Sequence, residues 1–219
     1  MAKIPDVRRN IRDDIVAGRL GFGSRITIDE LASRYGVSHM PIREALRELH
    51  GEGLVVIEPN RGARIPPIDI SFVENFFDTR SALEVVLTRR AARMCSPAIL
   101  AELLRMEGDL ERFMERGDHA AVLVANRAFH QCIYEQAGNP EALAVVDRHW
   151  LLIAALWSRY GYGEERYVGV ANDHRHIIFA LESADPEAAG VLMTAHVLKA
   201  KQDMMRRMRA ASPTVSLAS

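Results

Sequence analysis

Residues 36–46 read Gly36-Val37-Ser38-His39-Met40-Pro41-Ile42-Arg43-Glu44-Ala45-Leu46, and this stretch decides the fold of the amino-terminal part of the chain. A glycine ends one helix, a serine suits the N-cap of the next, and a proline is tolerated in its first turn. An apolar stripe at helical spacing follows, made of Ile42, Ala45, Leu46 and Leu49. We therefore predict a helix that begins after Ser38 and buries one side.

The other side of this predicted helix carries positive charge. His39, Arg43 and Arg47 lie four residues apart, with Met40 beside them, so they share one exposed face. Taken alone, the pattern also fits an ordinary solvated helix surface. The flanking segments decide between the two interpretations.

Two shorter helices are expected before this stretch. Val7, Ile11 and Ile15 form a buried stripe that ends near Gly18, and a loop follows. Residues 27–30, Thr-Ile-Asp-Glu, are a capping box that opens a short helix ending at Gly36. The second of these helices and the helix after Ser38 are predicted to be joined by a tight turn at Gly36.

A hairpin is predicted after the positively charged helix. Residues 54–57 are a β-branched run, residues 58–62 form a turn, and residues 63–65 return as a second strand. Helix, turn, helix and hairpin in this order predict a winged helix-turn-helix that binds DNA. In such a complex, arginines of the helix can donate hydrogen bonds to guanine, and Ser38 can donate one to a phosphate. Arg61, at the hairpin tip, can enter the minor groove or contact the DNA backbone.

The amino-terminal motifs resemble the GntR family of bacterial transcription regulators. The likeness lies in residues 18–20, 31–32, 36–46, 52–55 and 61–63. It implies that Ser38, His39 and Arg43 meet DNA and that Arg61 and Gly62 form the wing tip. The full candidate DNA-binding set is Ser38, His39, Met40, Arg43, Arg47, Arg61 and Gly62. The family most often has Arg-Thr where this chain has His39-Met40, which implies a different base preference.

The chain is expected to be mainly α-helical, with two domains. Pro66-Pro67 interrupts regular structure, so residues 1–66 form the winged domain and residues 67–210 the second domain. Breaks near residues 96, 117, 138, 161 and 185 leave about six helices and predict an all-helical antiparallel bundle. The family resemblance implies that this domain binds an effector and mediates dimerisation. Residues 211–219 are small and polar, and we predict a disordered tail.

Composition excludes several classes of protein. The 219 residues are 48% hydrophobic and 26% charged, which favours folded domains over disorder. The longest apolar run, residues 151–157, is too short to span a membrane, and the amino terminus lacks a secretory signal, so we expect a cytoplasmic bacterial protein, at the nucleoid when bound to DNA. Two cysteines without Cys-x-x-Cys spacing argue against a thiolate zinc site. The net charge of −1 leaves room only for a local basic face.

Four residues of the second domain suggest a metal site. Asn126 and His130 lie one helical turn apart, and His174 and His196 fall on two later helices. If these helices pack together, three imidazoles and an amide oxygen converge on an ion such as zinc or nickel. Alternatively, any one of these histidines is an ordinary core or surface residue that binds no metal. We adopt that interpretation for the other histidines, which are His39, His50, His119, His149 and His176.

The second domain resembles the FCD effector-binding domain of FadR-like GntR regulators. The likeness lies in residues 78–84, 126–130 with 138–139, 173–175 with 180–181, and 185–196. It places the metal ligands on Asn126, His130, His174 and His196, and the effector-facing arginine on Arg80. The family's first ligand is usually aspartate, so Asn126 implies weaker binding, a different metal or none. An internal ion pair with Glu84 is the alternative role for Arg80.

We predict a homodimeric transcription regulator, a repressor rather than an activator, that binds palindromic operator DNA under the control of a small carboxylate effector. An enzyme is the first rival class. The chain contains no Glu-x-x-His, His-Glu-x-x-His or Gly-x-Ser-x-Gly, which argues against a di-iron centre or a hydrolase. The second rival is a structural or metal-storage protein whose winged domain binds protein.

Overall fold

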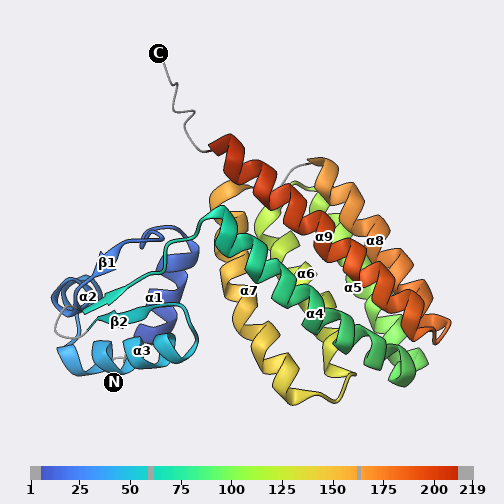
Figure 1. Ribbon diagram of the computed structural model, residues 1–219, viewed down its shortest axis with the longest axis horizontal. Coiled ribbons are helices and arrows are strands. Elements are labelled where there is room, and N and C mark those ends of the chain that lie inside the picture. Colours follow the sequence, from blue (N-terminus) through green and yellow to red (C-terminus); the bar gives the residue numbers. More distant parts are fainter. Residues whose placement is uncertain (1–5, 59–61, 162–163, 212–219) are drawn as a thin grey trace, which may run out of the picture. The chain divides into compact units, whose positions relative to one another are not determined.

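The computed structural model describes residues 6–58, 62–161 and 164–211, which contain nine helices and three short strands (Figure 1). Spatial contacts divide the chain into two units. The first comprises Met1–Asp69 with Leu151–Arg159, and the second comprises Ile70–Trp150 with Tyr160–Ser219. The fold class predicted from sequence, a small winged domain followed by a helical domain, is confirmed.

The first unit contains helices α1 (Val7–Val16), α2 (Ile28–Tyr35) and α3 (His39–Gly51). The predicted capping box is present: Thr27 Oγ1 accepts from the Glu30 amide across 3.2 Å, and Glu30 accepts from the Thr27 amide across 2.8 Å. Gly36 ends α2 with a φ of +66°, which is the conformation that favours glycine. Ser38 occupies the N-cap of α3, as predicted, and its side chain makes no capping hydrogen bond.

Three short strands form the wing. β1 (Arg25–Ile26), β2 (Val56–Glu58) and β3 (Gly62–Arg64) pair antiparallel in the order β1-β3-β2. β2 begins two residues later than expected, because the Leu54 amide still bonds to the Leu49 carbonyl at the end of α3. β1 was not expected, since a two-residue strand is too short to show an alternating pattern. The wing is therefore anchored to the segment before α2.

The core of the first unit unites all three helices and the wing. Its fully buried members include Ile11 of α1, Ile42 and Leu49 of α3, and Ala63 of β3. A buried carboxylate lies at its edge: Asp14 of α1 accepts hydrogen bonds from the side chains of Arg19, Arg34 and Tyr35. These contacts fix α1 against α2 and therefore position α3, which rests on both.

The second unit is a bundle of long helices. They are α4 (Ile70–Met94), α5 (Pro97–Glu115), α6 (His119–Glu135), α7 (Pro140–Tyr160), α8 (Glu164–Glu182) and α9 (Pro186–Ala211), except that Leu151–Arg159 of α7 belongs to the first unit. Each break predicted from sequence separates two of these helices. The predicted tail starts one residue too early, because α9 includes Ala211, and its remainder, residues 212–219, lies outside the described residues.

The bundle surrounds a polar interior. α4 lies along α9, and α5 packs against both α6 and α8 (Figure 1). Several buried side chains of the interior are polar: Arg80, Glu84, Glu107, Asn126, His130, Arg166, Asp173, His174 and His196. Buried polar groups are costly unless they are paired or bind something, so this interior is a candidate site. Within the described part of the chain, no helix combines the length and apolarity needed to cross a membrane.

Candidate nucleic-acid interface and candidate metal centre

Helix α3 is held by its apolar side, as the sequence predicts. Ile42, Ala45, Leu46 and Leu49 are buried, whereas the residues on the other side are exposed. The exposed set comprises Ser38, His39, Met40, Arg43 and Arg47. Met40 is 72% exposed and lies beside His39 on this face.

A hollow of about 620 Å³ lies between α3 and the wing. Its lining includes Arg43 and Arg47 from α3, Arg25 from β1, Asp29 from α2 and Glu58 from β2. The acidic groups are already engaged, since His39 Nε2 lies 3.0 Å from Asp29 Oδ1 and Glu58 accepts from Arg64. Arg43 and Arg47 form no ion pair within the described residues, so both remain available to an anionic partner such as DNA.

The wing tip is only partly described. Arg61, predicted to contact DNA, lies outside the described residues. Gly62 follows it with a φ of +89°, and a β-carbon there would lie 2.5 Å from the Ile26 carbonyl oxygen. Glycine is thus required for the pairing of β3 with β1, a structural role that the sequence analysis did not assign.

Three histidines converge inside the second unit. His130 lies on α6, His174 on α8 and His196 on α9, and one ligand nitrogen from each lies within 4.8 Å of the others. The Nε2 atoms of His130 and His196 are 3.2 Å apart. All three side chains are buried. The packing of helices that the sequence analysis required for a metal site is therefore present.

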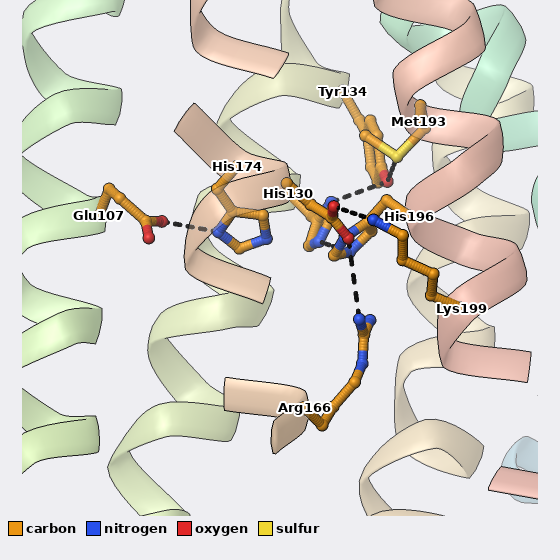
Figure 2. A network of polar contacts seen from close by, with 9 residues as sticks. Glu107, His130, Tyr134, Arg166, His174, Met193, His196 and Lys199 are labelled. Carbon is orange, nitrogen blue, oxygen red and sulfur yellow. Dashed lines mark hydrogen bonds and ion pairs between the residues drawn. The ribbon is translucent and has the colours of Figure 1, made fainter. Parts of the chain in front are cut away.

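The opposite nitrogen of each ring is held by a neighbour, as Figure 2 shows for His130 and His174. His174 Nδ1 lies 2.6 Å from Glu107 Oε2, and His196 Nδ1 lies 3.3 Å from a carboxylate oxygen of Asp173. His130 Nδ1 lies 3.1 Å from the hydroxyl of Tyr134, which donates to Met193. A hydrogen-bond acceptor beside Nδ1 keeps the ring proton on that nitrogen. The Nε2 atom is then unprotonated, and its lone pair points into the cluster.

Burial keeps two of the rings neutral. Burial, followed by the neighbouring histidines and the guanidiniums of Arg80 and Arg166, holds the pKa of His130 and His196 well below the ordinary value. A neutral imidazole is the form that binds a metal ion.

The donor set fits a divalent transition metal. His174 Nε2 and Asn126 Oδ1 are both buried and have no hydrogen-bond partner among the described residues. The three converging imidazole nitrogens suit zinc or nickel, and the carboxylates behind two of the rings are the outer partners that such sites use.

Arg80 lies beside the histidines in a buried ion pair. Its Nε and Nη2 atoms both contact Glu84 Oε1 across 2.7 Å. The guanidinium carbon lies 5.2 Å from the ring centre of Phe77 and 5.3 Å from that of Trp150, which in turn contacts His130. The ion pair between Arg80 and Glu84, which the sequence offered as the alternative role of Arg80, is therefore present next to the candidate metal site.

Several residues of this site were not found from sequence. Glu107, Tyr134, Asp173 and Arg166 surround the histidines, and only Asp173, adjacent to His174, carried a local signal. The remaining histidines lie elsewhere: His50 contacts the Val55 carbonyl, His119 stacks on Tyr167, His149 packs on Phe76 and His176 is exposed.

Comparison with known protein families also divides the chain into an amino-terminal and a carboxy-terminal domain. Residues 4–65 match the profile of "Bacterial regulatory proteins, gntR family", and residues 75–199 match the FCD domain. The chain is 30% identical over 192 residues to the probable D-xylose utilization operon transcriptional repressor of Paenarthrobacter nicotinovorans, covering 87% of this chain and 84% of that protein. It is 27% identical over 195 residues to the transcriptional repressor RspR of Escherichia coli K12, with the same coverage.

Solved structures share the fold. McbR/YncC of E. coli superposes with a TM-score of 0.77 at 20% identity, covering 92% of this chain and 96% of that one. Lar of Listeria monocytogenes gives a TM-score of 0.68 at 19% identity, covering 97% and 100%. The family matches and relatives are transcriptional regulators, not enzymes, in agreement with the sequence analysis. The chain belongs to the GntR family of bacterial regulatory proteins, carries an FCD domain as FadR-like members do, and is a DNA-binding transcriptional regulator.

Proposed function

We propose that this regulator is a homodimeric repressor that binds palindromic operator DNA in the cytoplasm and responds to a small organic acid. Two of its relatives are named repressors, one of them of a sugar utilization operon. One winged domain contacts too little DNA for high specificity, whereas a two-fold dimer reads two half-sites. Genes of carbon metabolism are the targets that this proposal favours.

In this proposal, α3 enters the major groove and the wing meets the adjacent backbone. Arg43 and Arg47 donate to guanine or phosphate, and His39 and Met40 contact base edges. The Ser38 hydroxyl, which makes no cap, donates to phosphate. Arg61 and Gly62 form the wing tip.

A divalent metal, zinc or nickel, is held in the second domain by Asn126, His130, His174 and His196. The observation that carries this proposal is the convergence of three buried histidines whose Nδ1 atoms all have partners. When bound, the ion supplies a Lewis-acidic position for a carboxylate oxygen. Glu107 and Asp173 orient His174 and His196 toward it.

The effector binds beside the histidines through its carboxylate. Arg80 offers a guanidinium for a bidentate contact, shared with or released from Glu84. An acid bound there rearranges the charges between α4, α8 and α9, and we propose that this shifts the population of DNA-binding states.

Metal content tests this proposal directly. Purified wild type, His174→Ala and His176→Ala are compared by elemental analysis. His176 is the matched control, because it lies two residues away on α8 but is exposed. We expect about one zinc or nickel ion per chain in wild type and in the control, and a large loss in His174→Ala. Equal metal content in all three proteins would remove His174 from the ligand set.

The effector class is tested by thermal shift. Sugar acids, hydroxy acids, dicarboxylates and amino acids are added with and without zinc or nickel. An acid that raises the melting temperature only in the presence of metal, and that releases operator DNA in a footprinting assay, supports a metal-dependent repressor. An acid that strengthens the footprint would identify an activator or a corepressed regulator instead.

A further inference from the structure

Arg166 is a buried guanidinium with unused hydrogen-bonding capacity. It lies in the first turn of α8, and its side chain is only 6% exposed. Its Nη1 atom is 3.8 Å from Asp173 Oδ2, which is an ion pair but too long for a hydrogen bond. Its Nε atom is buried and has no hydrogen-bond partner among the described residues. A buried donor without a partner indicates a missing acceptor.

This guanidinium points toward the histidine cluster. The same Asp173 oxygen that faces Arg166 lies 3.3 Å from His196 Nδ1, so one carboxylate separates the arginine from the cluster. In Figure 2 the Arg166 side chain extends from α8 toward the group formed by His196 and Lys199. The charge of Arg166 is also among the causes that lower the pKa of His130 and His196, consistent with its closeness.

The charged groups around the cluster are nearly all paired with one another. Among the described residues, the buried carboxylates are Glu84, Glu107 and Asp173 and the buried cations are Arg80 and Arg166, while Lys199 contacts Asp173 from the surface. The four candidate metal ligands are three imidazoles and an amide, none of which carries a negative charge. A divalent ion therefore adds positive charge that the buried groups offset only in part, and buried charge without compensation is costly.

The two buried arginines differ in how many of their N–H donors already have a partner. Arg80 directs two nitrogen atoms to Glu84 at 2.7 Å and lies over the rings of Phe77 and Trp150. Within the described residues, Arg166 has the long contact with Asp173 and an Nε atom without a partner. Arg166 is thus the less saturated of the two guanidiniums.

We propose that the effector is a dicarboxylate, and that Arg166 receives its second acid group. One carboxylate lies at the metal and Arg80, and the other accepts hydrogen bonds from Nε and an Nη atom of Arg166. The first acid group offsets the remaining charge of the ion, and the second supplies the acceptor that the Nε atom of Arg166 lacks. This inference rests on the carboxylate-effector function proposed above and adds the ligand class and the residue that selects it.

Matched acids test the inference. The full-length, zinc-loaded protein is titrated calorimetrically with malonate, succinate and glutarate, each beside the monoacid of equal carbon number: propionate, butyrate and pentanoate. We expect at least one diacid to bind tenfold or more tightly than its monoacid. Arg166→Gln should reduce this ratio to near one, and Arg166→Lys, which keeps the charge, should retain more of it. Arg116→Gln, which removes an exposed arginine at the end of α5, should leave the ratio unchanged.

The outcomes separate the two proposals. Monoacids that bind as tightly as diacids, or a ratio that survives in Arg166→Gln, would overturn the diacid inference while leaving a carboxylate effector in place. Absence of binding by every acid would overturn the carboxylate effector itself, and the diacid inference with it. Circular dichroism and zinc content are measured for each variant. If Arg166→Gln does not fold, the diacid-to-monoacid affinity ratios of wild type and Arg166→Lys test the diacid inference.

Discussion

Glu107 Oε2 lies 2.6 Å from His174 Nδ1, and this contact joins α5 to α8 inside the bundle. The carboxylate accepts the Nδ1 proton, so the Nε2 lone pair of the ring faces His130 and His196. Glu107 is therefore a positioning residue for the candidate metal site rather than a ligand.

Replacing Glu107 by glutamine should weaken metal binding. The amide removes the negative charge that fixes the tautomer of His174, and loss of such outer partners costs roughly 10- to 100-fold in affinity. The measurement is a competition titration with a chromophoric chelator. Glu111→Gln is the control, because Glu111 lies one turn further along α5 and pairs with Arg175 at the surface. Equal affinities in the two variants would contradict the role of Glu107.

Replacing Arg43 by alanine should abolish operator discrimination and leave the fold intact. Arg43 is exposed and has no ion-pair partner within the described residues, so its loss disturbs no internal contact. A lost base contact costs about 1–3 kcal/mol in specificity. Footprinting on operator and scrambled duplexes measures the effect, and Arg9→Ala, on the exposed side of α1, controls for the loss of charge. A wild-type footprint from Arg43→Ala would contradict the assignment of α3 as the recognition helix.

Gly62→Ala should destabilise the first unit. A β-carbon there would lie 2.5 Å from the Ile26 carbonyl oxygen, and the φ of +89° is strained for alanine. We expect a loss of about 1–3 kcal/mol in the free energy of unfolding, measured by urea denaturation. Gly21→Ala is the control, because nothing lies within 4 Å of its β-carbon. Should both variants unfold at the same urea concentration, the close approach of β1 to β3 would be disproved.

Asp14 should make the first unit sensitive to acid. Burial raises the pKa of Asp14, but hydrogen bonds from Arg34, Arg19 and Tyr35 outweigh it, and the net pKa lies below the ordinary value of 3.8. A lowered folded-state pKa gives stability that is present above the unfolded value and is lost as the pH falls below it. Unfolding free energy should therefore decline below about pH 4.

Asp14→Asn should remove this part of the decline. The variant should also lose about 1–3 kcal/mol at pH 7, because Arg19 and Arg34 lose their shared partner. Urea denaturation across pH 3–7 measures both effects. Asp13→Asn is the control, since the neighbouring Asp13 is exposed and pairs only loosely with Arg9. If the unfolding free energy of Asp14→Asn declines below pH 4 as steeply as that of wild type, other carboxylates cause the acid sensitivity.

Local patterns predicted most of the fold, since helix boundaries depend on neighbours in sequence. The capping box at Thr27 and the helix end at Gly36 are contacts within a few residues. The β1 strand could not be predicted, because it exists only through pairing with β3, about forty residues later.

The candidate site was predictable only in part. The spacing of Asn126 and His130 placed both on one face, and the structure brings His130 together with His174 and His196. The role of Glu107 could not be inferred, because it depends on how α5 packs against α8, 67 residues away in sequence. The unpartnered Nε of Arg166 likewise emerges only from the packed bundle.

The three histidines are contributed by α6, α8 and α9, and the last of them precedes the end of the described chain by only fifteen residues. During translation, the third nitrogen donor is synthesised only after α6 and α8 are complete. A prematurely terminated product lacking α9 would therefore carry at most two of the three imidazoles and could not assemble the cluster.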